Sequence, residues 1–248
     1  MRRYPKGAVV LCLILAGCAH RLTPPSAAKP RRFACHRAAG PIAIDGVPDE
    51  PAWGHAEEIL DFRVAGTGAR PQTKASARFL WDNEYLYLAV TMEDLDIYGT
   101  RKEHDSQTWD DDVAELFIKP SDRTYPYYEF QVNALGTTFD ALFGRRGAGG
   151  LDRWRPWESG MKAAVKIKGT LNNWEDKDQG WTVEVAIPLK AFTATTPLPQ
   201  LGDRWRFAVC RYDYSVYIND GPEYTSSALL KEVNFHKYEY YDYLEFAE

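Results

Sequence analysis

Alternation of apolar and polar side chains along short runs is the feature that most constrains the fold of this chain. The first clear example is "KASARFLW", residues 74–81, in which every second side chain is apolar. A turn-forming "DNE" follows, and "YLYLAVTM" then has apolar residues on both faces, as a strand inside a sandwich would. We therefore predict a β-hairpin over residues 74–92.

The same two-residue period returns in later segments, and long helical periodicity is hard to find. These segments are "DVAELFIKP" (112–120), "YYEFQVN" (127–133), "AAVKIKGT" (163–170), "GWTVEVAIPLKAF" (180–192) and "RWRFAVCRYDY" (204–214). Turns rich in Gly, Pro, Asn and Asp separate them. The pattern predicts an all-β fold, a jelly-roll-type β-sandwich of two antiparallel sheets, with minor helix near residues 51–57 and after Pro188.

The N-terminus is typical of a secretory signal. It has a basic start and an apolar core over residues 8–16, which is too short to span a bilayer. The core ends in "LAGC", residues 15–18, which resembles the bacterial lipobox. That resemblance implies cleavage before Cys18 and lipid on its thiol. The alternative is an ordinary signal peptide that is cut elsewhere.

These features give the expected domain organisation. Residues 1–17 would be a lipoprotein signal peptide, residues 18–32 a flexible lipidated tether, and residues 33–248 a single globular domain. We expect no second catalytic domain after the closing "YDYLEFAE". Ala19 follows the cysteine, so the aspartate of an inner-membrane retention signal is missing. We expect an exported protein, anchored by lipid in the outer membrane of the cell envelope.

The charge of the chain excludes one class of partner. The net charge is −5, and the signal region removes only basic residues. An acidic chain of this kind argues against nucleic acid, and against a basic patch for membrane surfaces. The membrane partner is therefore reached through the N-terminal lipid alone.

Cysteine use is sparse after the signal region. Cys35 and Cys210 remain, and an exported protein could join them in a disulfide or keep both as buried free thiols. No CxxC motif or His/Cys cluster suggests zinc.

The stretch "SQTWDDDVAELFIKP", residues 106–120, points to function. Glu115 lies in the middle of one predicted strand, and Glu129, Gln131 and Asn133 lie along the next. If the two strands pair, these side chains share one face, and Trp109 reaches that face from the preceding loop. An indole covers the C–H faces of a sugar ring, and carboxylates and amides bind its hydroxyls. The alternative is the polar outer face of an ordinary sheet.

A series of motifs supports the sugar hypothesis. They are "PIAIDGVPDEPAWGHAEEILDF", "FLWDNEYLYLAVTMED", "WDDDVAELFI", "YYEFQVNALG", "GWTVEVAIP" and "NFHKYEYYDYLEF", and they run in order through residues 41–246. Together they resemble carbohydrate-binding module family 9. The resemblance implies a jelly-roll sandwich that binds mono- and oligosaccharides, often at chain ends, with the sugar ring held between two aromatic side chains.

The resemblance also implies the residues of a carbohydrate-binding site. Those residues are Trp109, Glu115, Gln131, Asn133 and Phe235, and His236 joins the candidates because it is next to Phe235. Phe235 and Trp109 would be the two aromatics, and His236 a hydroxyl donor or a structural residue. The chain departs from the family in three places. Phe235 replaces a tryptophan of some members, Gln131 replaces a basic residue, and Tyr241-Asp242 replaces a Phe-Gly pair.

The same fold commonly carries calcium as a structural ion. Asp94, Asp96 and residues 110–112 place hard oxygen ligands in loops, so calcium at Asp94 and Asp96 is one hypothesis. The other is that these aspartates are solvated or hold their loops. For Asp112 we expect hydrogen bonds from backbone N–H groups. We expect no other cofactor.

The Gly-rich segment 145–159 contains two tryptophans. It could form a lid, with Trp154 or Trp157 lining the site. The alternative is a surface loop that one buried tryptophan holds in place.

The function predicted from all this is a non-catalytic, lipid-anchored carbohydrate-binding protein that takes part in polysaccharide use. Its partner would be a mono-, oligo- or polysaccharide. One alternative is a glycoside hydrolase that uses Glu115 and Glu129. Another is a haem carrier ligated by Met92, although the alternation around Met92 places it in the core. The last is a structural or adhesive lipoprotein that binds no sugar.

Overall fold

The structure is a computed structural model that describes residues 29–219 and 221–248. The predicted signal peptide, Cys18 and most of the predicted tether therefore lie outside the described residues. Within the described part of the chain, no helix is both long and apolar enough to cross a bilayer. The first strand begins at Arg32, one residue before the predicted start of the domain.

Strands dominate the described residues. In chain order they are β1 (Arg32–Arg37), β2 (Glu58–Ile59), β3 (Arg63–Val64), β4 (Ala75–Trp81), β5 (Tyr85–Met92), β6 (Val113–Lys119), β7 (Tyr127–Asn133), β8 (Thr138–Phe143), β9 (Lys162–Lys168), β10 (Gly180–Pro188), β11 (Arg204–Asp213), β12 (Glu223–Ser226) and β13 (Asp242–Phe246). Every segment predicted from alternation contains a strand, although residues 189–192 of the segment 180–192 lie in a 3₁₀ turn.

Helix is confined to short 3₁₀ turns in the described residues. They are η1 (Pro51–His55), η2 (Thr108–Asp110), η3 (Leu151–Arg153), η4 (Leu189–Ala194) and η5 (Tyr238–Tyr240). The two turns predicted from the sequence correspond to η1 and η4. Pro51 opens η1 and Pro188 precedes η4, in positions where a missing N–H costs no hydrogen bond.

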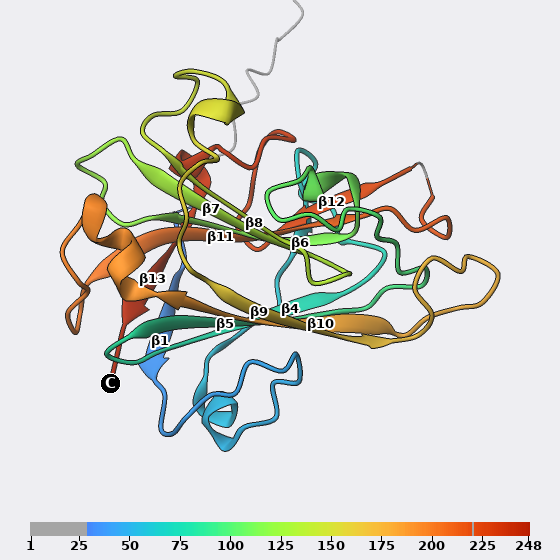
Figure 1. Ribbon diagram of the computed structural model, residues 1–248, viewed down its shortest axis with the longest axis horizontal. Helices are drawn as coiled ribbons and strands as arrows, with labels where there is room; N and C mark the ends of the chain where they lie inside the picture. The colour runs from blue at the N-terminus through green and yellow to red at the C-terminus, as the bar shows by residue number, and fades with distance from the viewer. Residues whose placement is uncertain (1–28, 220) are drawn as a thin grey trace, which may run out of the picture.

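The strands form two packed layers (Figure 1). One layer has the order β8-β7-β6-β11-β13, with β12 beside β11, and the other has the order β4-β5-β10-β9. Strand β1 belongs to both, because residues 32–35 pair with β13 and residues 36–37 pair with β4. The predicted sandwich is confirmed. The layers are antiparallel apart from β1, which runs parallel to both of its neighbours.

The main core fills the space between the layers. It contains the apolar sets that alternation assigned to the inner faces, such as Leu116 on β6, Phe130 on β7 and Phe207 on β11. Burial of each side chain of this size stabilises the fold by roughly 1.5–3 kcal/mol. Met92 also lies in this core, which confirms its predicted place.

A second apolar cluster covers the outer face of the β6-β7-β8-β11 layer. Phe117, Phe139, Phe143, Phe235 and Tyr241 are among its buried members. The loop around residues 144–160 and the segment around residues 227–240 lie over this face (Figure 1, yellow and red). The outer face is therefore roofed by loops, and these loops supply walls for a cavity.

Cys35 and Cys210 are both buried free thiols. Cys35 packs in the core between the layers, whereas Cys210 packs in the outer cluster on the opposite side of the sheet. The disulfide alternative is thus wrong, since the sheet separates the two sulfurs. Burial raises the pKa of both thiols, which keeps them protonated and unreactive.

Candidate functional site

A cavity of about 420 Å³ opens on the outer face of the β6-β7-β8-β11 layer. It contains five of the six residues that the sequence predicted for the site. Its lining residues are Trp109, Glu115, Phe117, Glu129, Gln131, Phe139, Phe143, Leu151, Tyr212, Val233, Asn234, Phe235 and His236.

The floor of the cavity comes from two neighbouring antiparallel strands. Glu115 on β6 lies directly opposite Gln131 on β7, and Phe117 lies opposite Glu129. The predicted pairing of these strands is confirmed, and with it the shared face. Because side chains alternate along a strand, Leu116 and Phe130 point the other way, into the core.

Glu115 is the most exceptional group in the cavity. Its side chain reaches the cavity lining, yet the residue is only 2% exposed. Burial raises the pKa of the Glu115 carboxyl well above its usual range, and the nearby Glu129 carboxylate raises it further. Within residues 29–219 and 221–248, no group donates a hydrogen bond to this carboxyl. Its oxygens are therefore free to accept hydrogen bonds from a ligand.

Gln131 is already engaged by its protein neighbours. Its Nε2 donates to Glu129 Oε1 at 2.6 Å, and its Oε1 accepts from the hydroxyl of Thr108. Burial raises the pKa of Glu129, while His236 and the hydrogen bond from Gln131 act in the opposite direction. The amide thus fixes the position of Glu129 and links it to the turn η2 that carries Trp109.

Aromatic rings form the rest of the walls. Trp109 is half-buried on η2 and meets Phe139 edge to face, with 5.6 Å between ring centroids. Phe235 comes from the segment around residues 227–240, and its ring centroid lies 5.2 Å from that of Tyr212. The hydroxyl of the buried Tyr241 donates to the carbonyl of Phe235, so the residue that departs from the family pattern supports the second aromatic.

His236 adds a polar group at the edge of the cavity. Its Nδ1 lies 3.0 Å from the hydroxyl of Tyr127 and 4.0 Å from Glu129 Oε2. The ring rests edge-on against Phe117, with 5.2 Å between centroids. The rest of the imidazole is partly exposed and can meet a ligand.

Asn133 was predicted to belong to the site, but it does not line the cavity. Its Nδ2 donates to the carbonyl of Arg101 and to Asp111, and its Oδ1 accepts from the N–H groups of Leu135 and Thr137. The side chain is fully buried and all its groups are used. It closes the turn at the end of β7 instead of facing a ligand.

Several lining residues escaped prediction. Phe139 and Phe143 come from β8, whose alternation in "TFDALF" could have revealed them. Tyr212 lies on the face of β11 opposite to Trp205, a second readable signal. The Gly-rich loop contributes Leu151, not its tryptophans: Trp154 packs against the outer cluster and Trp157 against the core.

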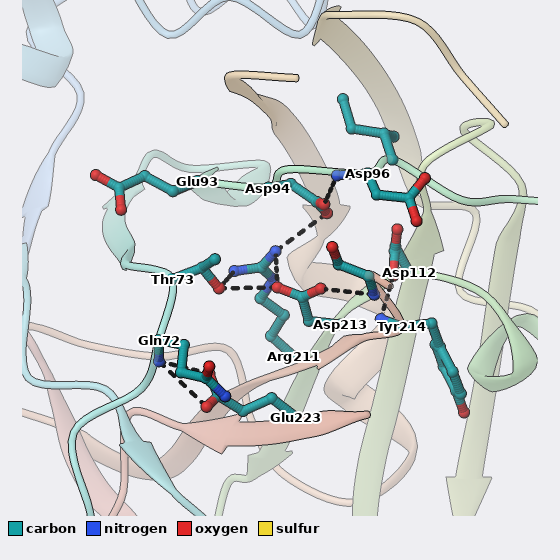
Figure 2. Close-up of polar contacts among 12 residues, drawn as sticks. Gln72, Thr73, Glu93, Asp94, Asp96, Asp112, Arg211, Asp213, Tyr214 and Glu223 are labelled. Atoms are coloured by element: carbon teal, nitrogen blue, oxygen red, sulfur yellow. Dashed lines mark hydrogen bonds and ion pairs between the residues drawn. The ribbon is translucent and has the colours of Figure 1, made fainter. Parts of the chain in front are cut away.

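Asp94, one of the two predicted calcium residues, lies in a buried ionic cluster with Asp112, Arg211 and Asp213, which we call the Arg211 cluster (Figure 2). Asp94, Asp112 and Asp213 each offer an oxygen, and these atoms lie within 4.8 Å of one another. Asp96 is not part of this group. Arg211 Nη2 lies 3.1 Å from Asp94 Oδ2 and 2.6 Å from Asp213 Oδ2.

The cluster is satisfied by protein donors. Each carboxylate oxygen of Asp94, Asp112 and Asp213 accepts from a backbone N–H, an indole, a hydroxyl or the guanidinium. Asp112 accepts from two backbone N–H groups, which confirms its predicted loop-holding role. The positive charge of Arg211 already occupies the place of a cation. Calcium at Asp94 and Asp96 stays a prediction, and these contacts argue against it.

Sequence comparisons identify similar proteins. The family model described as "Carbohydrate family 9 binding domain-like" matches residues 44–237. Endo-1,4-beta-xylanase A of Thermotoga maritima is 29% identical over 161 residues, which is 63% of this chain but 13% of that protein. Endo-1,4-beta-xylanase A of Thermotoga neapolitana is 32% identical over 101 residues, or 39% of this chain and 9% of that protein. This chain thus spans only a small part of these relatives.

Solved structures share the fold. A putative carbohydrate-binding protein from Bacteroides uniformis has a TM-score of 0.69 at 14% identity, with 88% of this chain and 99% of that chain covered. A family 9 carbohydrate-binding module from Caldicellulosiruptor kristjanssonii, in complex with cellotriose, has a TM-score of 0.57 at 16% identity over 88% and 94%. Its complex with glucose gives 0.58 at 17% over 87% and 95%.

Proposed function

Since this chain belongs to the carbohydrate family 9 binding domain-like family, we propose that it is a non-catalytic carbohydrate-binding protein. A sugar ring enters the cavity on the outer face of the β6-β7-β8-β11 layer. Trp109 and Phe235 cover the C–H faces of the ring. Glu115 accepts hydrogen bonds from its hydroxyls, and His236 contacts it at the cavity edge.

The free carboxyl of Glu115 carries this proposal. A buried polar group without a hydrogen-bond partner lowers the stability of the fold, so such groups are rare in native proteins and often have a functional role. Here the uncompensated group lies at a cavity that is otherwise mostly aromatic. Vicinal hydroxyls of a sugar would supply the missing donors to the Glu115 oxygens.

The aromatic walls support the same ligand class. Trp109 and Phe235 present flat apolar surface beside the acceptor, the combination that a ring with C–H faces and a hydroxyl rim requires. Phe235 offers a smaller surface than the tryptophan of some family members. We therefore expect a sugar preference that differs from theirs.

A hydrolase is the weaker reading. Glu115 and Glu129 both line the floor of the cavity, and a glycosidase uses two carboxyl groups. The similar xylanases, however, match this chain over only 13% and 9% of their lengths. The matched part is the family 9 domain, so the likeness lends no support to cleavage by this chain.

We propose further that the protein is exported and anchored by lipid on Cys18, in the outer membrane. The supporting observations are the basic and apolar N-terminal pattern and the "LAGC" motif. In that place it would hold a mono-, oligo- or polysaccharide at the cell envelope, as one step of polysaccharide use.

A glycan array followed by calorimetry tests the function. The purified chain is screened on the array, and glucose and cellotriose are titrated because a related module was solved with both. We expect binding, and we expect Trp109→Ala to weaken it by more than about 1 kcal/mol. The exposed Tyr125, which lines no part of this cavity, gives the control Tyr125→Ala. A folded chain that binds no glycan would favour the structural or adhesive lipoprotein instead.

A further inference from the structure

A second hollow of about 450 Å³ lies beside the turn that carries Trp109. We call it the outer groove. Its lining includes Asp96, Tyr98, Asp110, Trp174, Tyr214 and Val216. None of these residues lines the first cavity. The outer groove is therefore a separate surface, formed by the loops that follow β5, β9 and β11.

The outer groove exposes apolar side chains. Trp174 is 62% exposed, Val216 is 63% exposed, and the ring of Tyr98 is also open to solvent. Isolated exposed apolar residues are common, whereas these three line the same hollow and together form an apolar wall. A solvent-facing indole beside a phenol offers flat surface for a ring.

A buried acceptor faces the same hollow. Asp96 is only 6% exposed, and its Oδ2 accepts from the N–H of Val216 at 3.1 Å. Among the described residues its other oxygen, Oδ1, accepts no hydrogen bond. Figure 2 shows Asp96, Asp112 and Tyr214 on the same side of Arg211. The outer groove thus repeats the aromatic-plus-carboxylate chemistry of the first cavity.

The two hollows share one wall. Asp110 lines the outer groove, and its neighbour Trp109 lines the first cavity. The hydroxyl of Tyr214 donates to the carbonyl of Trp109 at 2.7 Å. The Tyr214 ring also lies 6.4 Å from the ring of Tyr212, which lines the first cavity. The turn η2 therefore borders both hollows.

The exposed tryptophan sits on a braced loop. The hydroxyl of Tyr217 donates to the carbonyl of Trp174 at 2.8 Å. Asn172 donates to the carbonyl of Gly99 and accepts from its N–H, at 2.8 and 2.9 Å. A surface that is held in place before binding loses less conformational entropy when a ligand arrives.

We infer that the outer groove is a second sugar subsite, which binds a further ring of the oligosaccharide whose first ring lies in the cavity. This inference rests on the proposed function. Trp174 packs on the ring and Asp96 accepts from its hydroxyls. The protein is thus a binder of short chains, with higher affinity for an oligosaccharide than for a single sugar.

Calorimetry on the purified full chain tests the subsite with glucose and cellotriose as probes. We expect cellotriose to bind more tightly than glucose. Trp174→Ala should weaken cellotriose binding about tenfold and leave glucose binding unchanged, because glucose fills only the first cavity. Trp174→Phe should recover part of the loss. Since the side chain is exposed, neither change should alter the melting temperature.

The control is Tyr125→Ala, which removes an aromatic of equal exposure, 62%, from a place outside both hollows. It should change neither affinity. If cellotriose binds no more tightly than glucose, or if its advantage survives Trp174→Ala, the subsite is overturned and the first cavity stands. If the unchanged chain binds neither probe, the proposed function fails for these sugars, and the subsite fails with it.

Discussion

Glu115 and Gln131 lie directly opposite each other on β6 and β7, yet only one of them is free to bind. The amide of Gln131 already donates a hydrogen bond to Glu129 and accepts one from Thr108. Glu115 receives no hydrogen bond from the described residues, and its carboxyl stays protonated more readily than usual because its pKa is raised. The cavity therefore pairs a positioning amide with an open acceptor.

Replacing Glu115 by glutamine should separate binding from stability. The change replaces a buried ionisable group that no protein donor compensates with a neutral amide, so the free energy of unfolding should stay constant or rise. Sugar affinity should fall by about tenfold or more, because one of the two carboxyl oxygens that would accept from sugar hydroxyls becomes an NH2 group. Calorimetry with cellotriose and urea unfolding measure the two effects. A large loss of stability would mean that Glu115 serves the fold instead.

Glu184 provides the matched control. It is also a fully buried glutamate in mid-strand, but its oxygens accept from the indole of Trp53 and from the N–H groups of Asp45 and Gly46. Glu184→Gln should lower the free energy of unfolding by about 1–3 kcal/mol. It should leave sugar affinity intact, since Glu184 lies outside the cavity.

The strands could be predicted because their signal is local. A period of two is visible within seven residues, and consecutive strands such as β6 and β7 pair by default. The parallel pairing of β1 was not predictable in this way. Its partner β13 lies at the other end of the chain, and no local pattern records a register between Arg32 and Tyr243.

The site shows the same division. The shared face of Glu115 and Gln131 follows from alternation on neighbouring strands, so it was predicted. The burial of Asn133 was not, because its partners lie in the loop that contains Arg101 and Asp111. The Arg211 cluster was missed for a related reason: Asp94, its partner, is 117 residues away in the sequence.

The stability of the Arg211 cluster should not depend on calcium. Arg211→Met would leave Asp94 and Asp213 buried without their guanidinium, at a cost of about 3–5 kcal/mol. We expect the melting temperature to fall by about 10 °C, as differential scanning calorimetry would measure. A chelator added to the unchanged protein should have no such effect, because Arg211 already supplies the positive charge.

Arg206→Met is the control for this change. Arg206 pairs with the half-exposed Asp122, and a pair near the surface contributes only about 0–1 kcal/mol. The interpretation would be reversed if chelation lowered the melting temperature of the unchanged protein and added calcium restored it. Calcium, in that case, would share the aspartates with Arg211.

The lipid anchor can be tested without the structure. Cys18→Ser should move the protein from the membrane fraction to the soluble fraction, because it removes the thiol that would carry lipid. Cys12→Ser, within the predicted signal, should leave the protein with the membrane. Mass spectrometry of the mature N-terminus reads the lipid directly. An unmodified N-terminus at another residue would support the ordinary signal peptide.

Asp140 should make the stability of the fold depend on pH. It lies on β8 with its carboxyl buried against Ser159, and burial raises its pKa to about 6 from the usual 3.8. The folded state therefore keeps a proton that the unfolded state has lost in this window. The stability that Asp140 contributes is complete below pH 3.8 and is lost as the pH rises through 6.

The measurement is urea unfolding of the protein and of Asp140→Asn between pH 4 and pH 7. The unfolding free energy of the protein minus that of Asp140→Asn should fall by up to about 1.4 kcal/mol per pH unit between pH 4 and pH 6. It should level off as the pH approaches 7. Asp94, whose pKa burial also raises to about 6, is present in both proteins and cancels in the difference. Parallel curves across the whole range would show that Asp140 has an ordinary pKa in the folded protein.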